Sequence, residues 1–234
     1  YTFFFATDNV VTINPHVYKS TGFKPEDLVP VSVASSFSQT LVCHPSLGLK
    51  TLADLAKAAK AGKLSYASGG AGAPGHLAME LWLSQAGVKM QHVPYKGSTP
   101  ALADLMGGHL SFAGSSISSA ASLIGSGKVR ALAVTSIKRN ASLPDIPTVA
   151  EFGYKDFNAI SFYGVMGPAG IPAPVVQRLN ADVNKILVRP DVREAFQKQG
   201  FDSSPMSSEE FAALIRADIN KSREIITSAK IKIE

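Results

Sequence analysis

Apolar and polar residues alternate in blocks through the middle of the chain, and the blocks have the lengths of strands and helices. Short apolar runs at 64–68, 90–93, 110–113 and 129–135 predict strands, and the longer stretches between them show helical spacing. The run VRALAVT at 129–135 is almost continuously apolar, as expected of a strand that is covered on both faces. Regular alternation of strands and helices with short loops predicts a layered α/β fold with a parallel sheet.

Capping residues mark the ends of two of these helices. Thr51 and Asp54 form a capping-box pattern that opens a helix over Leu52–Ala61, and Gly62 predicts a left-handed end. Pro74 suits the first position of the next helix, and Gly87 predicts its end.

The two ends of the chain follow a different pattern from the middle. The first forty residues are strand-like with irregular loops, and 41–44 predicts a strand that passes from one lobe to another. A strand is expected at 160–166, followed by helices at 175–188, at 190–199 and after Ser207. Ser207 and Glu210 form a second capping-box pattern.

Composition limits the class of protein. The 234 residues are 45% hydrophobic and 18% charged, which indicates a well-buried globular chain of one or two lobes. The net charge is +5 without a run of Lys or Arg, which argues against a nucleic-acid partner and agrees with an anionic small ligand. Cys43 is the only cysteine and lies in an apolar run, so we expect it in the core and expect no disulfide.

Targeting and membrane signals are absent from the sequence. No apolar run is long enough to cross a bilayer, so we expect that the chain is not inserted in a membrane. The chain has no initiating Met and no signal-like region, and it opens inside a strand-like run, YTFFFA. We therefore expect a processed or incomplete form of a longer protein.

A glycine loop lies between the strand at 64–68 and the helix that Pro74 opens. Gly70, Gly72 and Gly75 spell G-x-G-x-x-G, the pattern of a dinucleotide-binding loop. A Rossmann site also needs an acidic residue about twenty residues further on, but that region reads MQHVPYKG. Pro74 removes a backbone N–H at the helix start, and no Walker A lysine follows. The loop is therefore not expected to bind a dinucleotide.

The same loop still has the chemistry of an anion site. A glycine loop that leads into a helix presents N–H groups at the positive end of the helix dipole. The Ser68 hydroxyl and the His76 imidazole are candidate side-chain donors beside Gly69, Gly70 and Gly72. The alternative is a tight turn in which the glycines only permit the backbone geometry, with His76 on the helix surface.

Three other polar segments follow predicted strands. Thr7-Asp8-Asn9 follows the first, PYKGS with Tyr95 and Lys96 follows the strand at 90–93, and Gly114-Ser115-Ser116 follows the strand at 110–113. Each also has a plainer interpretation, as an Asx turn, a solvated lysine or a helix entrance. Taken together at one sheet edge, they favour a pocket that hydrogen-bonds an anion.

Catalytic patterns are poorly represented. The chain has neither H-E-x-x-H nor G-x-S-x-G, and its five histidines show no metal-ligand spacing, so we expect no metal, no cofactor and no enzymatic activity. Two alternatives stay open. One is an α/β enzyme that binds a phosphorylated substrate or cofactor at the glycine loop, and the other is a ligand-sensing receptor for signalling.

Several motifs along essentially the whole chain resemble one family. They are ATDNVVTINPHVY, LVCHPSLGLKTLADL, KLSYASGGAGAPGHLAMEL, HVPYKGSTPALADLMGGHLSF, GKVRALAVTS, LPDIPTVAEFGY and SFYGVMGPAGIPAPVVQRLNADVNKIL. On these motifs the sequence resembles the extracytoplasmic solute receptors of tripartite tricarboxylate transporters, the Bug family.

This resemblance implies a type II periplasmic-binding-protein fold with two lobes and a hinge. The first lobe is expected at 1–43 and 157–234 and the second at 44–156. Such receptors are periplasmic, bind a small carboxylate and present it to integral membrane permease subunits. The implied ligand-binding residues are Thr7, Asp8, Asn9, Ser68, Gly69, Gly72 and His76, whereas Tyr95 and Lys96 match a turn of structural character. From the loop chemistry we add Gly70 and, nearby, Ser115 as expected ligand-binding residues.

Two departures from the family pattern affect these expectations. Members normally carry about sixty further residues upstream, so we expect the first lobe to be incomplete at its N-terminus. Many relatives also have an aspartate where this chain has Gly114-Ser115. Without that acid to pair with a ligand amino group, a plain mono- or dicarboxylate is a better expected ligand than an amino acid.

Overall fold

The computed structural model describes residues 2–62, 64–229 and 231. It divides into two compact units, the first formed by Tyr1–Phe37 with Ser161–Glu234 and the second by Ser38–Ile160. The chain passes from one unit to the other inside β2 (Leu28–Cys43) and again at the start of β7 (Ile160–Pro168). The lobe limits of 43/44 and 156/157 inferred from the sequence stay a prediction.

The second unit contains a mixed sheet. Strand β3 (Ser65–Ser68) pairs in parallel with β4 (Gln91–Pro94) and with β5 (Phe112–Ser116). The C-terminal end of β2 pairs antiparallel with β5 and with β6 (Arg130–Val134). The prediction of a parallel sheet is therefore confirmed for β3, β4 and β5 and wrong at β2, which runs antiparallel to both of its neighbours in this unit.

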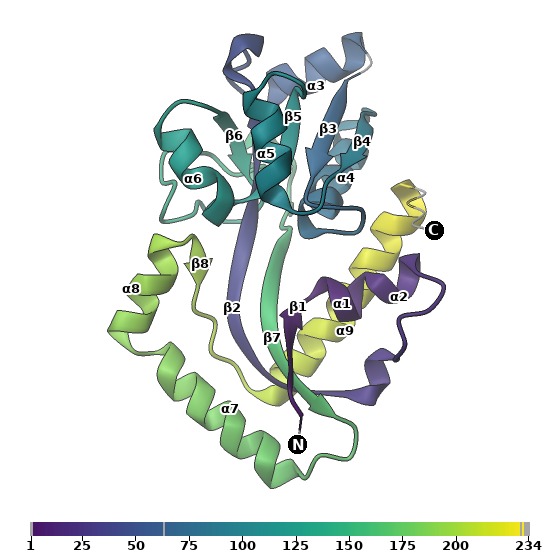
Figure 1. Cartoon of the computed structure of the whole chain (residues 1–234), viewed down its shortest axis with the longest axis vertical. Coiled ribbons are helices and arrows are strands. Elements are labelled where there is room, and N and C mark those ends of the chain that lie inside the picture. Colours follow the sequence, from purple (N-terminus) through teal and green to yellow (C-terminus); the bar gives the residue numbers. More distant parts are fainter. Residues whose placement is uncertain (1, 63, 230, 232–234) are drawn as a thin grey trace. The chain divides into compact units, whose positions relative to one another are not determined.

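Helices cover both faces of this sheet, as can be followed in Figure 1. They are α3 (Leu52–Ala61), α4 (Pro74–Ala86), α5 (Ser98–Met106) and α6 (Ile117–Gly125), with short 3₁₀ turns at η2 (Pro45–Leu47) and η3 (Ala150–Phe152). Successive strand residues point to opposite faces, so Tyr66 packs in one core with α3 and α4, whereas Ala67 packs in the other with α5. In the same way, Phe112 packs in the first of these cores and Ala113 in the second. Cys43 is fully buried in the first of these cores, as expected.

Two local predictions in this unit are wrong. Gly62 is extended, with φ −152°, and its N–H donates to the Ala58 carbonyl, so α3 ends without a left-handed residue. The strand predicted at 110–113 lies at Phe112–Ser116, because the backbone stays paired with β2 as far as Ser116. Gly114 and Ser115 therefore lie inside a strand and not in the loop that follows it.

The capping predictions are confirmed. Thr51 Oγ1 accepts from the Asp54 N–H at 3.1 Å, and Asp54 Oδ2 accepts from the Thr51 N–H at 2.9 Å. Helix α4 begins at Pro74 and is followed by Gly87 with φ 63°. In the first unit, Ser207 and Glu210 exchange the same two bonds, at 3.1 and 2.8 Å, at the start of α9.

The first unit is built on β1 (Phe4–Thr7), β7 and the N-terminal part of β2, with β7 between the other two. Strand β8 (Phe201–Asp202) pairs with β2 at Ser36 and Phe37. Its helices are α1 (Asn9–Thr12), α2 (Asn14–Val17), η1 (Pro25–Asp27), α7 (Ala173–Leu187), α8 (Pro190–Lys198) and α9 (Ser208–Ala229). The first forty residues are thus less strand-like than predicted, since two short helices follow β1.

The core of the first unit lies between α1, α9 and the strands. Val11, Val33, Phe162 and Phe211 pack together there. Gly164 lies directly under the Phe211 ring, since a Cβ on this glycine would be 2.5 Å from the ring. Helix α9 can therefore approach β7 closely, and β7 pairs with β1, the strand that precedes the loop at 7–9.

Candidate functional site

The glycine loop joins β3 to α4 in the second unit, and two of its glycines have backbone angles that favour glycine. Gly70 has φ 145° and Gly72 has φ 74°. Gly75 meets a different requirement, because a Cβ on it would lie 2.4 Å from the Gly114 carbonyl oxygen of β5. The loop is therefore a tight turn whose helical end is packed against the sheet backbone.

Ser68, the last residue of β3, is completely buried and its hydroxyl is used inside the loop. It donates to the Gly70 carbonyl at 2.9 Å and accepts from the Gly70 N–H at 3.2 Å. The same oxygen lies 2.8 Å from Nε2 of His92 in β4. A hydroxyl has one proton and two acceptor sites, so these three partners account for the whole capacity of Ser68.

His76, in the first turn of α4, is also buried and turned toward its own loop. Its Nδ1 accepts the Gly72 N–H at 3.0 Å, so the ring proton is on Nε2. The His76 and His92 rings stack at 3.8 Å with 9° between their planes. Burial, with a smaller contribution from the charge of His92, lowers the pKa of His76 to about 3, and burial lowers the pKa of His92 to about 4.

Two further polar side chains lie behind the histidines. The Tyr66 hydroxyl donates to Glu80 Oε1 at 2.5 Å, and the same oxygen is 3.9 Å from His76 Nε2. Burial raises the pKa of both Tyr66 and Glu80.

His92 was not predicted as a site residue, although it lies inside the HVPYKG motif. Nothing in the sequence shows that β4 lies beside β3 in the register that brings His92 to Ser68.

The loop keeps backbone donors that its own hydrogen bonds do not use. These bonds use the N–H groups of Gly70, Gly72 and Ala73, and those found among the described residues include none from Gly69, Ala71 or Gly75. Helix α4 is 13 residues long, so its N-terminus carries an appreciable positive dipole charge. The arrangement can bind an anion through backbone N–H groups.

The PYKG turn supports the glycine loop from the side. The Tyr95 N–H donates to the Ser68 carbonyl at 3.0 Å, and the Gly97 N–H donates to the Gly69 carbonyl at 2.9 Å. The Tyr95 hydroxyl donates to Asp104 Oδ2 at 2.5 Å, which raises the pKa of Tyr95. These contacts fit the structural character expected of the turn.

Ser115 is buried in β5, one residue after Gly114. Gly114 lies beside Ser68 in the sheet register and under Gly75, so β5 passes next to the loop. The Ser115 hydroxyl lies 3.4 Å from the Ser116 carbonyl, a weak contact. A ligand contact from Ser115 stays a prediction.

In the first unit, the predicted residues Thr7, Asp8 and Asn9 join β1 to α1. The Thr7 hydroxyl donates to the Asn9 side-chain oxygen. The Asp8 carbonyl accepts from the N–H and the hydroxyl of Thr12, each at 2.9 Å, and the Asp8 N–H donates to the Phe162 carbonyl at 3.0 Å. This backbone is well held.

The Asp8 carboxyl is buried, and its Oδ1 has no hydrogen-bond partner among the described residues. Burial and, less strongly, the nearby Asp218 carboxyl of α9 together raise the pKa of Asp8 to about 7, although a hydrogen bond with Ser161 lowers it. Asp8 is therefore a buried acid with one carboxyl oxygen left without a partner among the described residues. Its predicted ligand contact stays a prediction.

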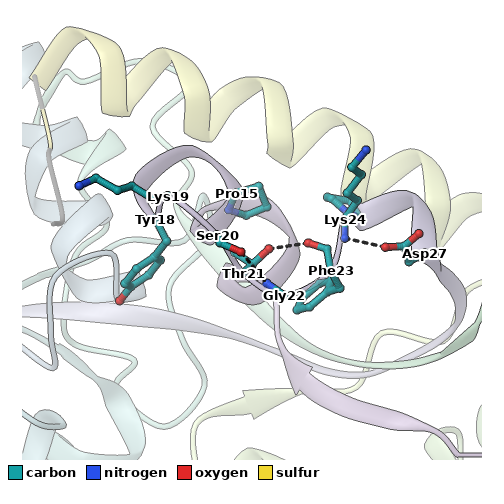
Figure 2. A pocket seen from close by; sticks show the side chains of 10 residues that line it. Pro15, Tyr18, Lys19, Ser20, Thr21, Gly22, Phe23, Lys24 and Asp27 are labelled. Atoms are coloured by element: carbon teal, nitrogen blue, oxygen red, sulfur yellow. Dashed lines mark hydrogen bonds between the residues drawn. The ribbon is translucent and has the colours of Figure 1, made fainter.

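A pocket of about 510 Å³ lies elsewhere in the first unit, between α2 and η1 (Figure 2). Residues of 15–27 line it, among them Tyr18, Lys19, Lys24 and Asp27. Asp27 is engaged there, since its Oδ2 accepts the Lys24 N–H at 2.8 Å. None of the site residues predicted from the sequence lines this pocket.

Two features are absent from the described part of the chain. It holds no group of three or more His, Cys, Asp or Glu side chains arranged to bind a metal ion. No helix in it has the length and apolar character that crossing a membrane requires.

Residues 1–231 match the family model described as tripartite tricarboxylate transporter family receptor. A curated relative, the UPF0065 protein in the tcbD-tcbE intergenic region of Pseudomonas sp. (strain P51), is 38% identical over 208 residues. That match covers 88% of this chain and 62% of the relative, so the chain spans less than two thirds of the relative's length.

Solved structures agree with this family. The R. palustris protein Rpa4515, determined with adipate, is 31% identical, with a TM-score of 0.91 over 99% of this chain and 79% of that one. The periplasmic binding protein BugD is 28% identical, with a TM-score of 0.86 over 99% and 79%. The expected two-lobe fold of the periplasmic binding proteins is thereby confirmed, and the chain belongs to the tripartite tricarboxylate transporter receptor family.

Proposed function

We propose that this chain is the solute-binding part of an extracytoplasmic receptor for a tripartite tricarboxylate-type transporter. It captures a small mono- or dicarboxylate and presents it to integral membrane permease subunits, without catalysis. Membership of the receptor family supports this role. BugD, a periplasmic binding protein, supports a periplasmic location.

The observation that carries the proposal is the set of unpartnered N–H donors in the glycine loop. The N–H groups of Gly69, Ala71 and Gly75 have no acceptor among the described residues, whereas those of Gly70, Gly72 and Ala73 do. N–H donors with a helix dipole behind them suit a carboxylate. Binding by backbone groups needs no charged side chain in the loop.

The loop also favours a ligand without an amino group. Neither residues 68–76 nor the adjoining β5, Phe112–Ser116, contain an acidic residue that could pair with an ammonium group. Rpa4515 was determined with adipate, a linear dicarboxylate. A dicarboxylate of this kind is therefore the first ligand to test.

The test is calorimetric titration of the full-length protein. We expect binding of adipate or another mono- or dicarboxylate, and no binding of dimethyl adipate, which has the same chain without the charges. Tight binding of aspartate or glutamate would overturn the assignment to plain carboxylates. Binding of ATP with no carboxylate binding would overturn the receptor and favour an enzyme with a phosphorylated ligand.

A further inference from the structure

Two histidines from different elements of the second unit form a stacked pair directly behind the glycine loop. His76 comes from α4 and His92 from β4, and their rings are 3.8 Å apart and nearly parallel. Each ring makes one hydrogen bond to the loop, His76 to the Gly72 N–H and His92 to the Ser68 hydroxyl. The pair thus contacts both the beginning and the middle of the loop.

The hydrogen bonds determine the protonation state and tautomer of each ring. Nδ1 of His76 accepts an N–H, so it carries no proton, and the ring is neutral with its proton on Nε2. Ser68 gives its only proton to the Gly70 carbonyl, so Nε2 of His92 must donate to the Ser68 oxygen. The loop geometry therefore needs an acceptor at position 76 and a donor at position 92.

A charged ring would break this arrangement. Protonation of His76 would place a second donor against the Gly72 N–H, and an imidazolium would lie 3.8 Å from the other ring. The groups that face the pair are Tyr66 and Ser68 from β3 and Glu80 from α4. Glu80 already accepts from Tyr66 at 2.5 Å and is 3.9 Å from His76 Nε2, too far for a hydrogen bond.

We propose that His76 and His92 are positioning residues, a neutral stacked pair that holds the glycine loop in the conformation that binds carboxylate. This inference rests on the proposed function and deepens it. Ser68 and Gly72 then serve as the attachment points of the loop, and the unpartnered N–H groups of the loop are the ones left for the ligand.

The decisive variants separate hydrogen bonding from size. His76→Asn keeps an acceptor near the place of Nδ1, and His92→Gln keeps a donor near the place of Nε2, whereas leucine at either position keeps neither. We expect each leucine variant to lose about tenfold or more in dicarboxylate affinity, as for one lost buried hydrogen bond, and the amide variants to recover most of that loss. Thermal unfolding identifies any variant that has simply failed to fold.

A second measurement, of the histidine tautomers, requires no ligand. Long-range ¹H–¹⁵N correlation spectra of the histidines should show a proton on Nε2 of both rings and an unprotonated Nδ1 in His76. The Gly72 amide signal should move strongly in His76→Leu and much less in His76→Asn. A proton on Nδ1 of His76, or leucine variants that fold and bind like the wild type, would overturn the proposal.

The two measurements distinguish a failure of the proposed function from a failure of the proposed role of the histidine pair. If the wild type binds none of the carboxylates while the tautomers and the Gly72 shift are as expected, the proposed function fails and the role of the pair in loop geometry stands. Acidification adds a further readout, because protonation of the pair should weaken binding below about pH 4. The His76→Asn/His92→Gln double variant should lack that acid limb, with ligand protonation common to both proteins.

Discussion

The glycine loop of the second unit and the loop at 7–9 of the first unit both bury polar side chains, but they differ in how completely these side chains are hydrogen-bonded. Ser68 and His76 have partners for the polar atoms that face the loop. Asp8 keeps a buried carboxyl oxygen without a partner among the described residues, and its pKa rises to about 7. A loop whose buried side chains are hydrogen-bonded has one favoured geometry, whereas a buried acid with an unpartnered oxygen makes its unit sensitive to pH.

The largest expected effect breaks the geometry of the paired loop. Gly72→Val places a β-branched residue at φ 74°, a backbone region that costs such residues energy and displaces the N–H bonded to His76. We expect carboxylate affinity to fall at least ~1,000-fold, below detection in calorimetry.

The matched control is Gly127→Val, in the same unit but outside the loop. Gly127 has a similar φ of 70°, and a Cβ on it would meet nothing within 4 Å. This variant should lose comparable stability and keep its affinity. Equal losses of affinity in the two variants would show that strain anywhere in the unit, and not the loop, controls binding.

The next effect concerns the unpaired acid. Asp8 titrates near 7 in the folded chain and near 3.8 when unfolded, so the folded state binds the extra proton between these values. The contribution is favourable at low pH and is lost as the pH rises through about 7. Urea unfolding should show a wild type that loses ~2–4 kcal/mol between pH 4 and pH 8 relative to Asp8→Asn.

Asp218 provides the comparison within the same cluster. Burial also raises its pKa, to about 6, while Lys221 lowers it, so Asp218→Asn should reduce the pH dependence less than Asp8→Asn. A wild type whose stability is flat across this range would contradict the raised pKa of the buried Asp8.

A smaller effect is expected at the contact between Gly75, at the end of the glycine loop, and Gly114 of the sheet. A Cβ at Gly75 would press on the Gly114 carbonyl at 2.4 Å, so Gly75→Ala should destabilise the protein by ~1–3 kcal/mol, as overpacking does. Gly125→Ala, at the end of α6 with nothing within 4 Å of the added methyl, should be close to neutral. Thermal unfolding of both variants checks the difference.

The smallest expected effect is a change in the pKa of Asp8. Ser161 stabilises the charged form of Asp8 by a hydrogen bond, so Ser161→Ala should move the pH-dependent loss of stability to higher pH by less than about one unit. A shift to lower pH would show that Ser161 contacts Asp8 in another way.

Local signals in the sequence predicted much of the fold and the position of the glycine loop. The capping pairs, Pro74 and Gly87 act within a few residues, so they mark helix ends without knowledge of the fold. The glycine loop was located in the same way. The antiparallel course of β2 and the offset of β5 depend on pairing between distant segments, which local patterns do not contain.

The same limit applies to the chemistry of the loop. Residue types alone made Ser68 and His76 candidate donors to a ligand, and that stays a prediction. Their hydrogen bonds depend on His92, sixteen positions after His76, and on the register of β3 with β4. Which donors a loop leaves free is therefore a property of the packed sheet.

The contact of Gly75 with Gly114 has a consequence for the kinetics of capture. Backbone packed on backbone leaves the start of α4 little freedom, so little ordering entropy is lost when a solute arrives. Preorganised sites of this kind discriminate between ligands mainly by how fast they leave. In the proposed receptor, closely related carboxylates should therefore associate at similar rates and differ in residence time.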